Sequence, residues 1–538
     1  MGRFLSVAKT LTLRAHAPQR KHAESTRQTH RVHAHPADGS VQCRDEIASI
    51  SQKNEKIPGA SISQPPSTLP GWLIQRNGFK GTRMSTSTTA NARRYWLIAW
   101  IGVTLLALGL RWAYLSRMEV DGPLRGDAGQ YVSYAWNLVH HGVFSKNAPG
   151  SANVVPDSFR DPGYPSLLAA LMLVSDDFSP WYHHVLLFQG LLGALTVALL
   201  MAAARPWLGM KGAVVAGLLM AIWPHSITFT GYLLSETATA FWVALGLFLL
   251  QRTATRNSLP IMVGCGIAFG IAALTNAVMI PFAAILASIF WWRGNFTRSM
   301  ALALAIASLL LPIAWGVRNA QLPPAESSSG RALLNAIQGS WPEYHASYIA
   351  SIEGDPNAQR VQGSIQHEYD VAMTSRSAGM ALVSARMGEH PLRYLGWYAS
   401  KPALLWDWAI RMGQGNIYQY AALHSLLNEQ PILKALVALC WVLNPLIMCL
   451  ALAGVLLVWM KERGRSPLSL AVAVLAVYVT VVYSLLQAEP RYSIPFRGIE
   501  LILAVEAVRQ CLCWRAARNR RAGLSNWSRT ATDDPTTM

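Results

Sequence analysis

From Tyr95 onward the chain alternates long apolar runs with short polar stretches. Runs of about 17 to 25 residues have the length that an α-helix needs to cross the hydrocarbon core of a bilayer. The stretch 259–292 is broken by glycines and by Thr275-Asn276, and it is long enough for two short crossings or one re-entrant pair. The pattern predicts an all-α polytopic membrane protein with a bundle of about 10 to 12 transmembrane helices. The clear runs are 95–115, 184–204, 212–231, 236–251, 299–317, 432–460, 467–487 and 493–510.

Basic residues orient these spans, because short loops that face the cytoplasm carry an excess of Lys and Arg. The basic clusters all fall on one side if the stretch 259–292 crosses twice, which gives about ten spans and places both termini in the cytoplasm. Two longer segments then lie outside, 116–182 and 319–431, and the first of them is acidic. The clusters are Arg93/Arg94, Arg205/Lys211, Arg252/Arg256, Arg293/Arg298, Lys461/Arg463/Arg465 and Arg515 to Arg521.

This orientation divides the chain into five parts. Residues 95–318 form a transmembrane module that contains the acidic outer loop, and residues 319–431 form a helical segment outside the membrane. Residues 432–510 return to transmembrane helices, and residues 511–538 form a basic cytoplasmic tail. Residues 1–94 are polar and basic and show no sustained apolar period, so we expect them to be disordered.

The first residues allow three interpretations. They are basic and free of acidic side chains, as in a transit peptide, and they also fit the myristoylation pattern M-G-x-x-x-S. The third interpretation, which we favour, is that translation begins at Met84, shortly before Arg93, Arg94 and the first apolar run. N-terminal sequencing of the native protein distinguishes the three.

Composition agrees with a membrane class. Of the 538 residues, 52% are hydrophobic and only 14% are charged, and the mean hydropathy is +0.24. The net charge of +18 is concentrated before the first span and after the last one. Because no RNA-binding motif accompanies this charge, the positive-inside tendency explains it better than nucleic-acid binding. None of the six cysteines lies in the outer segments, so no disulfide framework is predicted.

Ionisable side chains gather at the outer ends of the predicted spans. An amphiphilic substrate could present its polar head to such a cluster while its tail stays in the lipid. A transporter would instead place ionisable groups near the middle of the bilayer and would show paired halves of the chain. The clustered residues are Asp127, Arg160, Asp161, His225, Glu236, Arg318, Glu489 and Arg491.

Several short motifs resemble those of the GT-C membrane glycosyltransferases, glycosyltransferase family 39 in particular. They occur in the order of that family and extend over 370 residues, from Gly126 to Pro495. The motifs are Gly126-Asp127-Ala128-Gly129-Gln130-Tyr131, Arg160-Asp161-Pro162-Gly163-Tyr164-Pro165, Leu234-Ser235-Glu236-Thr237, Pro312 with Arg318-Asn319, His390-Pro391 to Tyr394 with Lys401, and Glu489-Pro490-Arg491-Tyr492 with Pro495.

The resemblance implies a polyprenyl-phosphate sugar donor, an acceptor on the periplasmic side and inversion at the anomeric carbon. Protein O-mannosyltransferases and the aminoarabinose transferase of lipid A belong to this group, so the acceptor could be a protein, a lipid or a glycan. The implied location is the bacterial inner membrane, with the site facing the periplasm. Many members have Asp-Glu where this chain has Asp127-Ala128, which puts in doubt any metal role that needs the second acid.

Displacing a lipid phosphate from a sugar requires a base for the proton of the acceptor and cations for the charge that develops on the phosphate. Asp127 is the predicted base, because partial desolvation at the membrane surface would raise its basicity. The alternative is a solvated loop residue or a helix cap. Arginine binds phosphate through two parallel hydrogen bonds. The predicted phosphate ligands are Arg491, Arg160 and Lys401, and the supporting polar residues are Glu236, Asp161, Tyr131 and Tyr492.

Metal binding and two other functions stay open. Glu236 and His225 are the candidate ligands of a divalent metal ion, although no second His or Cys lies at ligand spacing. Besides the enzyme, the chain could be a transporter or flippase of lipid-linked glycans, or a non-catalytic assembly factor of the membrane.

Overall fold

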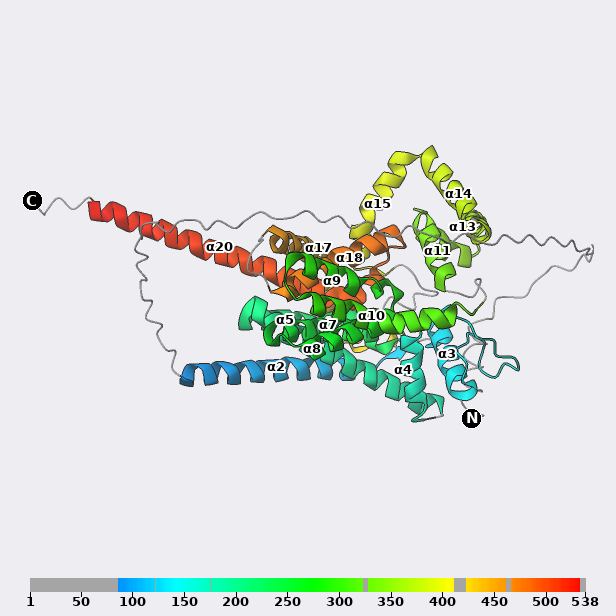
Figure 1. Cartoon of the computed structure of the whole chain (residues 1–538), viewed down its shortest axis with the longest axis horizontal. Helices are drawn as coiled ribbons and strands as arrows, with labels where there is room; N and C mark the ends of the chain where they lie inside the picture. The colour runs from blue at the N-terminus through cyan, green and yellow to red at the C-terminus, as the bar shows by residue number, and fades with distance from the viewer. Residues whose placement is uncertain are drawn as a thin grey trace, which may run out of the picture. The chain divides into compact units, whose positions relative to one another are not determined.

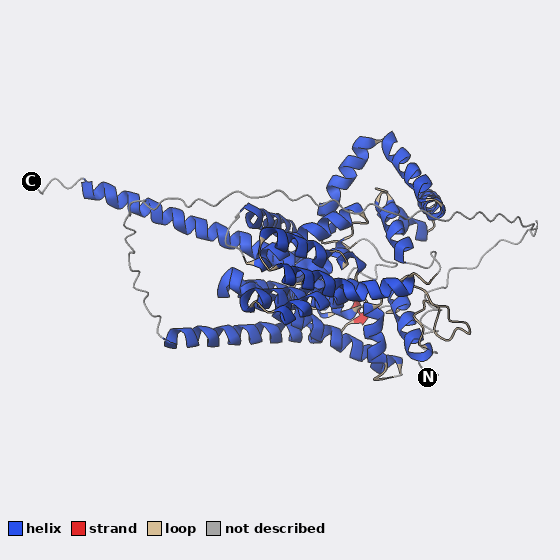
Figure 2. Cartoon of the chain, in the orientation of Figure 1, coloured by secondary structure: helices blue, strands red, loops and turns tan. Residues whose placement is uncertain are grey.

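The computed structural model describes residues 86–120, 122–175, 177–322, 328–410, 422–460 and 466–532. Helices make up about four fifths of this part of the chain, and its two short strands form one antiparallel pair (Figure 2). The predicted all-helical membrane class therefore agrees with the structure. Residues 1–85 of the predicted disordered segment lie outside the described residues. The end of that segment was predicted wrongly, since a helix begins at Thr86.

The helices and strands are given in their order along the chain. The first half contains α2 (Thr86–Leu115), β1 (Glu119–Val120), α3 (Asp127–His141), α4 (Gly163–Met172), α5 (Phe178–Ile222), α6 (Pro224–Thr228), η1 (Phe229–Gly231), α7 (Glu236–Arg256), α8 (Leu259–Thr275), η2 (Ala277–Met279), α9 (Phe282–Arg293) and α10 (Arg298–Asn319). The second half contains α11 (Ser328–Gly339), α12 (Tyr344–Ile352), α13 (Pro356–Thr374), α14 (Arg376–Glu389), α15 (Pro391–Leu405), β2 (Ala422–His424), α16 (Leu426–Glu429), α17 (Pro431–Met460), α18 (Pro467–Leu485), α19 (Pro490–Ser493), η5 (Ile494–Phe496) and α20 (Arg497–Thr532).

Five helices of the described residues are long and apolar enough to cross a membrane, by length and composition alone. They are α2, α5, α10, α17 and α18. α5 contains two predicted spans, 184–204 and part of 212–231, and its backbone leaves the helical conformation at Gly209 between them. The second span ends at Ile222, earlier than predicted, because the chain is extended at Trp223 and Pro224 follows. The stretch 259–292 is divided at Asn276 into α8 and α9.

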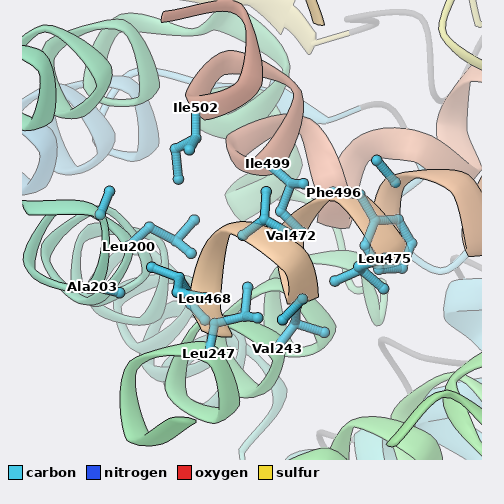
Figure 3. Close-up of a cluster of buried hydrophobic side chains, with 14 of the residues drawn as sticks. Leu200, Ala203, Val243, Leu247, Leu468, Val472, Leu475, Phe496, Ile499 and Ile502 are labelled. Atoms are coloured by element: carbon cyan, nitrogen blue, oxygen red, sulfur yellow. The ribbon is translucent and has the colours of Figure 1, made fainter. Parts of the chain in front are cut away.

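Burial separates central from peripheral helices. About three fifths of the apolar window is buried in α5 and α18 (61% each), whereas 17% is buried in α17 and 22% in α2. Figure 3 shows the interior around α18, where Leu468, Val472 and Leu475 meet side chains of α5, α7 and α20. α8 lies between α7 and α10, and α20 packs against both α5 and α17 (Figure 1). The exposed apolar faces of α2 and α17 suit contact with lipid tails.

The predicted outer segments are helical. The first contains α3 and α4, the second contains α11 to α15, and β1 pairs with β2 so that the first segment is tied to the chain before α17. Gly163, at the start of α4, touches the end of α8. A Cβ atom at Gly163 would lie 2.7 Å from the carbonyl of Leu274, so only glycine permits this approach. The contact brings Arg160 and Asp161 to the turn between α8 and η2.

Candidate active site

A cavity of about 920 Å³ lies where the ends of the helices meet the two predicted outer segments. Its wall is formed by α3, by the loop before α4, by the start of α7, by the turn after α8, by α11 and α12, and by the chain from the end of α18 through α19. The following predicted residues line it: Asp127, Tyr131, Arg160, Asp161, Glu236, Arg491 and Tyr492.

Asp127 lies between two arginines. Its Oδ1 is 2.5 Å from Nη2 of Arg160, and its Oδ2 is 2.9 Å from Nη1 of Arg491. Arg160 is held in turn, because its Nε donates to Oε1 of Gln130 at 2.7 Å and its guanidinium lies over the ring of Tyr131. The Asp127 side chain keeps 29% of its surface exposed, whereas the two arginines keep about a tenth. A bound molecule can therefore reach this carboxylate from the cavity.

Helix starts position both carboxylates that contact Arg491. Asp127 is the first residue of α3 and Glu236 is the first residue of α7, where the partial positive charge of a helix N-terminus favours an acidic side chain. Nε of Arg491 lies 2.5 Å from Oε1 of Glu236, whose side chain is 7% exposed. α7 also packs against η5, which follows α19. Arg491 thus joins the first outer segment to the membrane bundle.

The pKa of Asp127 is shifted in the direction opposite to the one that its sequence context predicts. Burial by itself raises the pKa of Asp127, but the charges and hydrogen bonds of Arg160 and Arg491 outweigh burial and hold the pKa well below its ordinary value. The expectation that desolvation increases the basicity of Asp127 is therefore wrong. The physical reason is that two cations stabilise the carboxylate more than the loss of water destabilises it.

A second ion pair crosses the cavity at Asp161. Nη2 of Arg331, on α11, lies 2.7 Å from Oδ2 of Asp161, and the backbone N–H of Ala277 donates to the same oxygen at 3.3 Å. The sequence motifs singled out Asp161 but not Arg331. The available signal was a polar stripe on α11 at helical spacing, formed by Arg331, Asn335 and Gln338.

Aromatic and acidic groups complete the wall near α19. The ring of Tyr492 stacks on that of Tyr483, with centroids 5.1 Å apart, and its hydroxyl donates to Gln487. Glu489 is fully buried, and its Oε2 lies 3.6 Å from Nε2 of His345 on α12. Glu489 belongs to the Glu-Pro-Arg-Tyr motif, whereas nothing in the sequence pointed to His345.

Two predicted site residues do not line the cavity. Lys401 is fully buried and donates to the carbonyls of Ser484 and Leu486, at 2.8 Å each, so it caps the end of α18. Burial lowers the pKa of Lys401 to about 7. His225 is also buried, and its Nε2 contacts the carbonyl oxygen of Trp408 at 3.0 Å.

The predicted metal pair does not form. Glu236 contacts Arg491, while His225 contacts a backbone carbonyl away from the cavity wall. In the described part of the chain, no group of three or more His, Cys, Asp and Glu side chains could hold a metal ion. The arrangement therefore does not fit a metal held by Glu236 and His225, and the chemistry proposed below uses none.

Comparisons with known proteins returned distant likenesses in structure alone. No protein-family model and no curated protein matches the chain. The apo Archaeoglobus fulgidus oligosaccharyltransferase is 14% identical with a TM-score of 0.43, over 79% of this chain and 52% of that one. The same archaeal enzyme, AglB, in complex with an inhibitory peptide and a dolichol-phosphate, is 13% identical with a TM-score of 0.41, over 80% and 52%.

ArnT from Cupriavidus metallidurans, bound to undecaprenyl phosphate, is 14% identical with a TM-score of 0.33, over 77% of this chain and 78% of that one. The chain spans about half the length of the archaeal oligosaccharyltransferase structures. At these scores the likenesses carry no argument about chemistry, which depends on the residues of the cavity.

Proposed function

We propose that the chain is a GT-C-type membrane glycosyltransferase, which moves a sugar from a polyprenyl-phosphate carrier to an acceptor on the periplasmic side. The observation that carries this proposal is the position of Asp127, in contact with both Arg160 and Arg491 on the wall of one cavity. A carboxylate that can take a proton and two cations that can hold a phosphate are the groups that displacement of a lipid phosphate requires.

In the proposed reaction, the hydroxyl or amine of the acceptor attacks the anomeric carbon of the donor sugar. The bond from that carbon to the phosphate oxygen breaks, the electron pair leaves with the polyprenyl phosphate, and the acceptor's proton passes to Asp127. Arg160 and Arg491 hold the leaving phosphate through charge-assisted hydrogen bonds. Attack from the face opposite the phosphate inverts the anomeric carbon.

Donor binding itself would activate the base. The pKa of Asp127 is low because both arginines face this carboxylate. A phosphate that takes up hydrogen bonds of Arg160 and Arg491 neutralises part of their charge, so the pKa of Asp127 rises. Asp127 therefore becomes a better proton acceptor only when the donor is in place, which restricts proton transfer to the loaded enzyme.

The cavity is lined by the two segments that the positive-inside tendency predicts to lie outside, so the proposed location is the bacterial inner membrane with the site facing the periplasm. A polyprenyl chain would remain in the lipid while its phosphate reaches the arginines. AglB with dolichol-phosphate and ArnT with undecaprenyl phosphate bind carriers of this chemical class. The proposal for this chain is a sugar linked to such a carrier.

Binding of undecaprenyl phosphate to the purified protein in lipid nanodiscs tests the proposal. We expect wild type to bind it and Arg160→Gln to bind it about ten- to a hundredfold more weakly, because one charge-assisted contact is lost. Arg376→Gln, an exposed arginine at the start of α14, serves as the matched control and should bind like wild type.

Glycans and glycolipids of a deletion strain, compared with those of its parent, complete the test. Transfer is supported if a sugar is missing from the glycans of the deletion strain and reappears when the wild-type protein is expressed again. A flippase would move the donor but would form no product in nanodiscs that hold donor and acceptor. Absence of any binding to undecaprenyl phosphate by wild type would refute the proposed function.

The pH profile of transfer provides a further prediction. In wild type, Asp127 should stay ionised through the acidic range, since its pKa is held well below the ordinary value, so kcat/KM should show no acid limb from Asp127 above about pH 4. In Arg160→Gln one depressing charge is gone while burial still acts, so the pKa of Asp127 rises and an acid limb should move to higher pH. Identical profiles for the two proteins would contradict the assignment of Asp127 as the base.

A further inference from the structure

One face of α11 forms a polar stripe on the cavity wall. Arg331, Asn335 and Gln338 all line the cavity and are spaced four and three residues apart, so they lie above one another on the same side of the helix. The stripe is about 10 Å long at 1.5 Å per residue. Its two amide side chains are neighbours on the helix surface, about 5 to 6 Å apart at their Cβ atoms.

Both ends of the stripe are fixed. At one end Arg331 pairs with Asp161, and at the other end Gly339 follows Gln338 and packs against the backbone of Leu486. A Cβ atom at Gly339 would lie 1.7 Å from the carbonyl oxygen of Leu486, so no other residue permits this contact. Leu486 leads into the motif that carries Arg491, and Asp161 follows Arg160, so each end of the stripe contacts a segment that carries a proposed phosphate ligand.

The amides of Asn335 and Gln338 make no hydrogen bond to any group in the described part of the chain, and both are half-buried against the cavity. Three other amide side chains of the wall make hydrogen bonds to neighbouring side chains. Gln130 accepts from Arg160, Gln487 accepts from Tyr492, and Asn276 donates to Tyr483. Each free amide offers both a donor and an acceptor, the combination that matches a sugar hydroxyl.

Three of the four acids that line the cavity contact arginines. Asp127 contacts two arginines, Glu236 contacts Arg491, and Asp161 contacts Arg331. Glu489 lies beside His345. A sugar with an ammonium group beside the stripe would have to break the ion pair of Asp161 with Arg331 to use that carboxylate, whereas a neutral sugar would not.

We propose that Asn335 and Gln338 recognise the donor sugar, and that this sugar is a neutral, hydroxyl-bearing ring. The inference rests on the proposed function, since it places the sugar beside a phosphate held by Arg160 and Arg491. The amides would bind adjacent hydroxyls of one ring, at a distance that the spacing of the two residues on α11 allows. They are specificity-determining residues and take no part in bond breaking.

Equilibrium binding to the full-length protein in nanodiscs tests the assignment. The probes are undecaprenyl phosphate, undecaprenyl-phosphate-linked glucose, galactose and mannose, and undecaprenyl-phosphate-linked 4-amino-4-deoxyarabinose. Wild type should bind the best neutral donor about tenfold more tightly than the amino-sugar donor. Asn335→Leu and Gln338→Leu should each weaken binding of that neutral donor about 2- to 10-fold and leave binding of undecaprenyl phosphate unchanged.

A variant that gains a new donor preference separates loss of sugar recognition from loss of folding, because a misfolded protein gains no preference. Gln338→Glu adds a carboxylate to the stripe two helical turns from Arg331 and should shift the preference toward the amino-sugar donor about tenfold. Gln366→Leu, an exposed amide on α13, is the control and should behave like wild type.

The outcomes separate the two proposals. If wild type binds no undecaprenyl phosphate, the proposed function fails and this inference fails with it. If wild type binds undecaprenyl phosphate but the Asn335 and Gln338 variants bind every sugar donor as wild type does, only this inference is overturned. A change confined to the KM of the acceptor would also overturn the assignment to the donor sugar.

Discussion

Replacing Asp127 with asparagine is expected to lower sugar transfer by about 10²- to 10⁴-fold, the usual contribution of a positioned general base. Asparagine has nearly the same shape and still accepts hydrogen bonds from Arg160 and Arg491, but it cannot take a proton from the acceptor. Donor binding should therefore persist while transfer is lost. The measurement is the rate of transfer from a radiolabelled undecaprenyl-phosphate sugar, together with binding of the same donor.

The control for this variant is Asp370→Asn. Asp370 is exposed on α13 and contacts Gln366 on its own helix, so neutralising it should change neither binding nor transfer. Both variants should elute as wild type does in size-exclusion chromatography. Transfer at the wild-type rate by Asp127→Asn would remove Asp127 from the reaction.

Replacing Arg491 with methionine is expected to destabilise the protein by about 3–5 kcal/mol and to abolish donor binding. The cost arises because Glu236, whose side chain is 7% exposed, would be left as a buried charge without its arginine. Removing that charge as well should recover most of the loss, so the double variant Arg491→Met with Glu236→Gln should unfold near the wild-type midpoint. Donor binding should stay lost in the double variant, because the phosphate ligand is still missing.

Denaturant unfolding in detergent micelles measures these differences, and Arg393→Met is the matched control. Arg393 forms an ion pair with Glu343, but its side chain is 51% exposed, so its loss should cost at most about 1 kcal/mol. Equal destabilisation by Arg491→Met and Arg393→Met would show that the Arg491 contacts contribute no more than a surface ion pair.

Many of the charged residues in the cavity wall could be predicted from the sequence. Charged residues are costly in the hydrocarbon core, so those that interrupt the chain at the ends of apolar runs must lie at a membrane face. Asp127, Arg160 and Arg491 satisfy this condition, as do Asp161 and Glu236, and all five line the same cavity. The positive-inside tendency predicts an outer position for them by an argument that requires no knowledge of their contacts.

Pairing within the wall could not be predicted from one sequence. Glu236 and Arg491 are 255 positions apart, and a pattern of apolar and polar residues does not record which distant groups touch. The sequence analysis therefore described Asp127 as a carboxylate at a desolvated surface. It did not predict the contacts with the two arginines that lower the pKa of Asp127.

Lys401 and Arg331 show the same limit on the outer helices. Both are cations on helices of the second outer segment, and the aromatic neighbours of Lys401 made it the more visible candidate. In the structure Arg331 lines the cavity, whereas Lys401 is buried against the end of α18. How a helix is rotated depends on what it packs against, and for α11 that includes the contact of Gly339 with Leu486.

The sequence by itself indicated the helical membrane class, predicted an outer position for the polar residues and identified most of the carboxylates and arginines that face the cavity. These follow from the free energy of transferring a side chain from water to lipid, which depends on the residue and its near neighbours in the chain. Only the tertiary structure decided which charges meet, which of them Asp127 contacts and which amides stay free. Coulomb energy and hydrogen bonding depend on the distance between atoms, and the fold sets that distance.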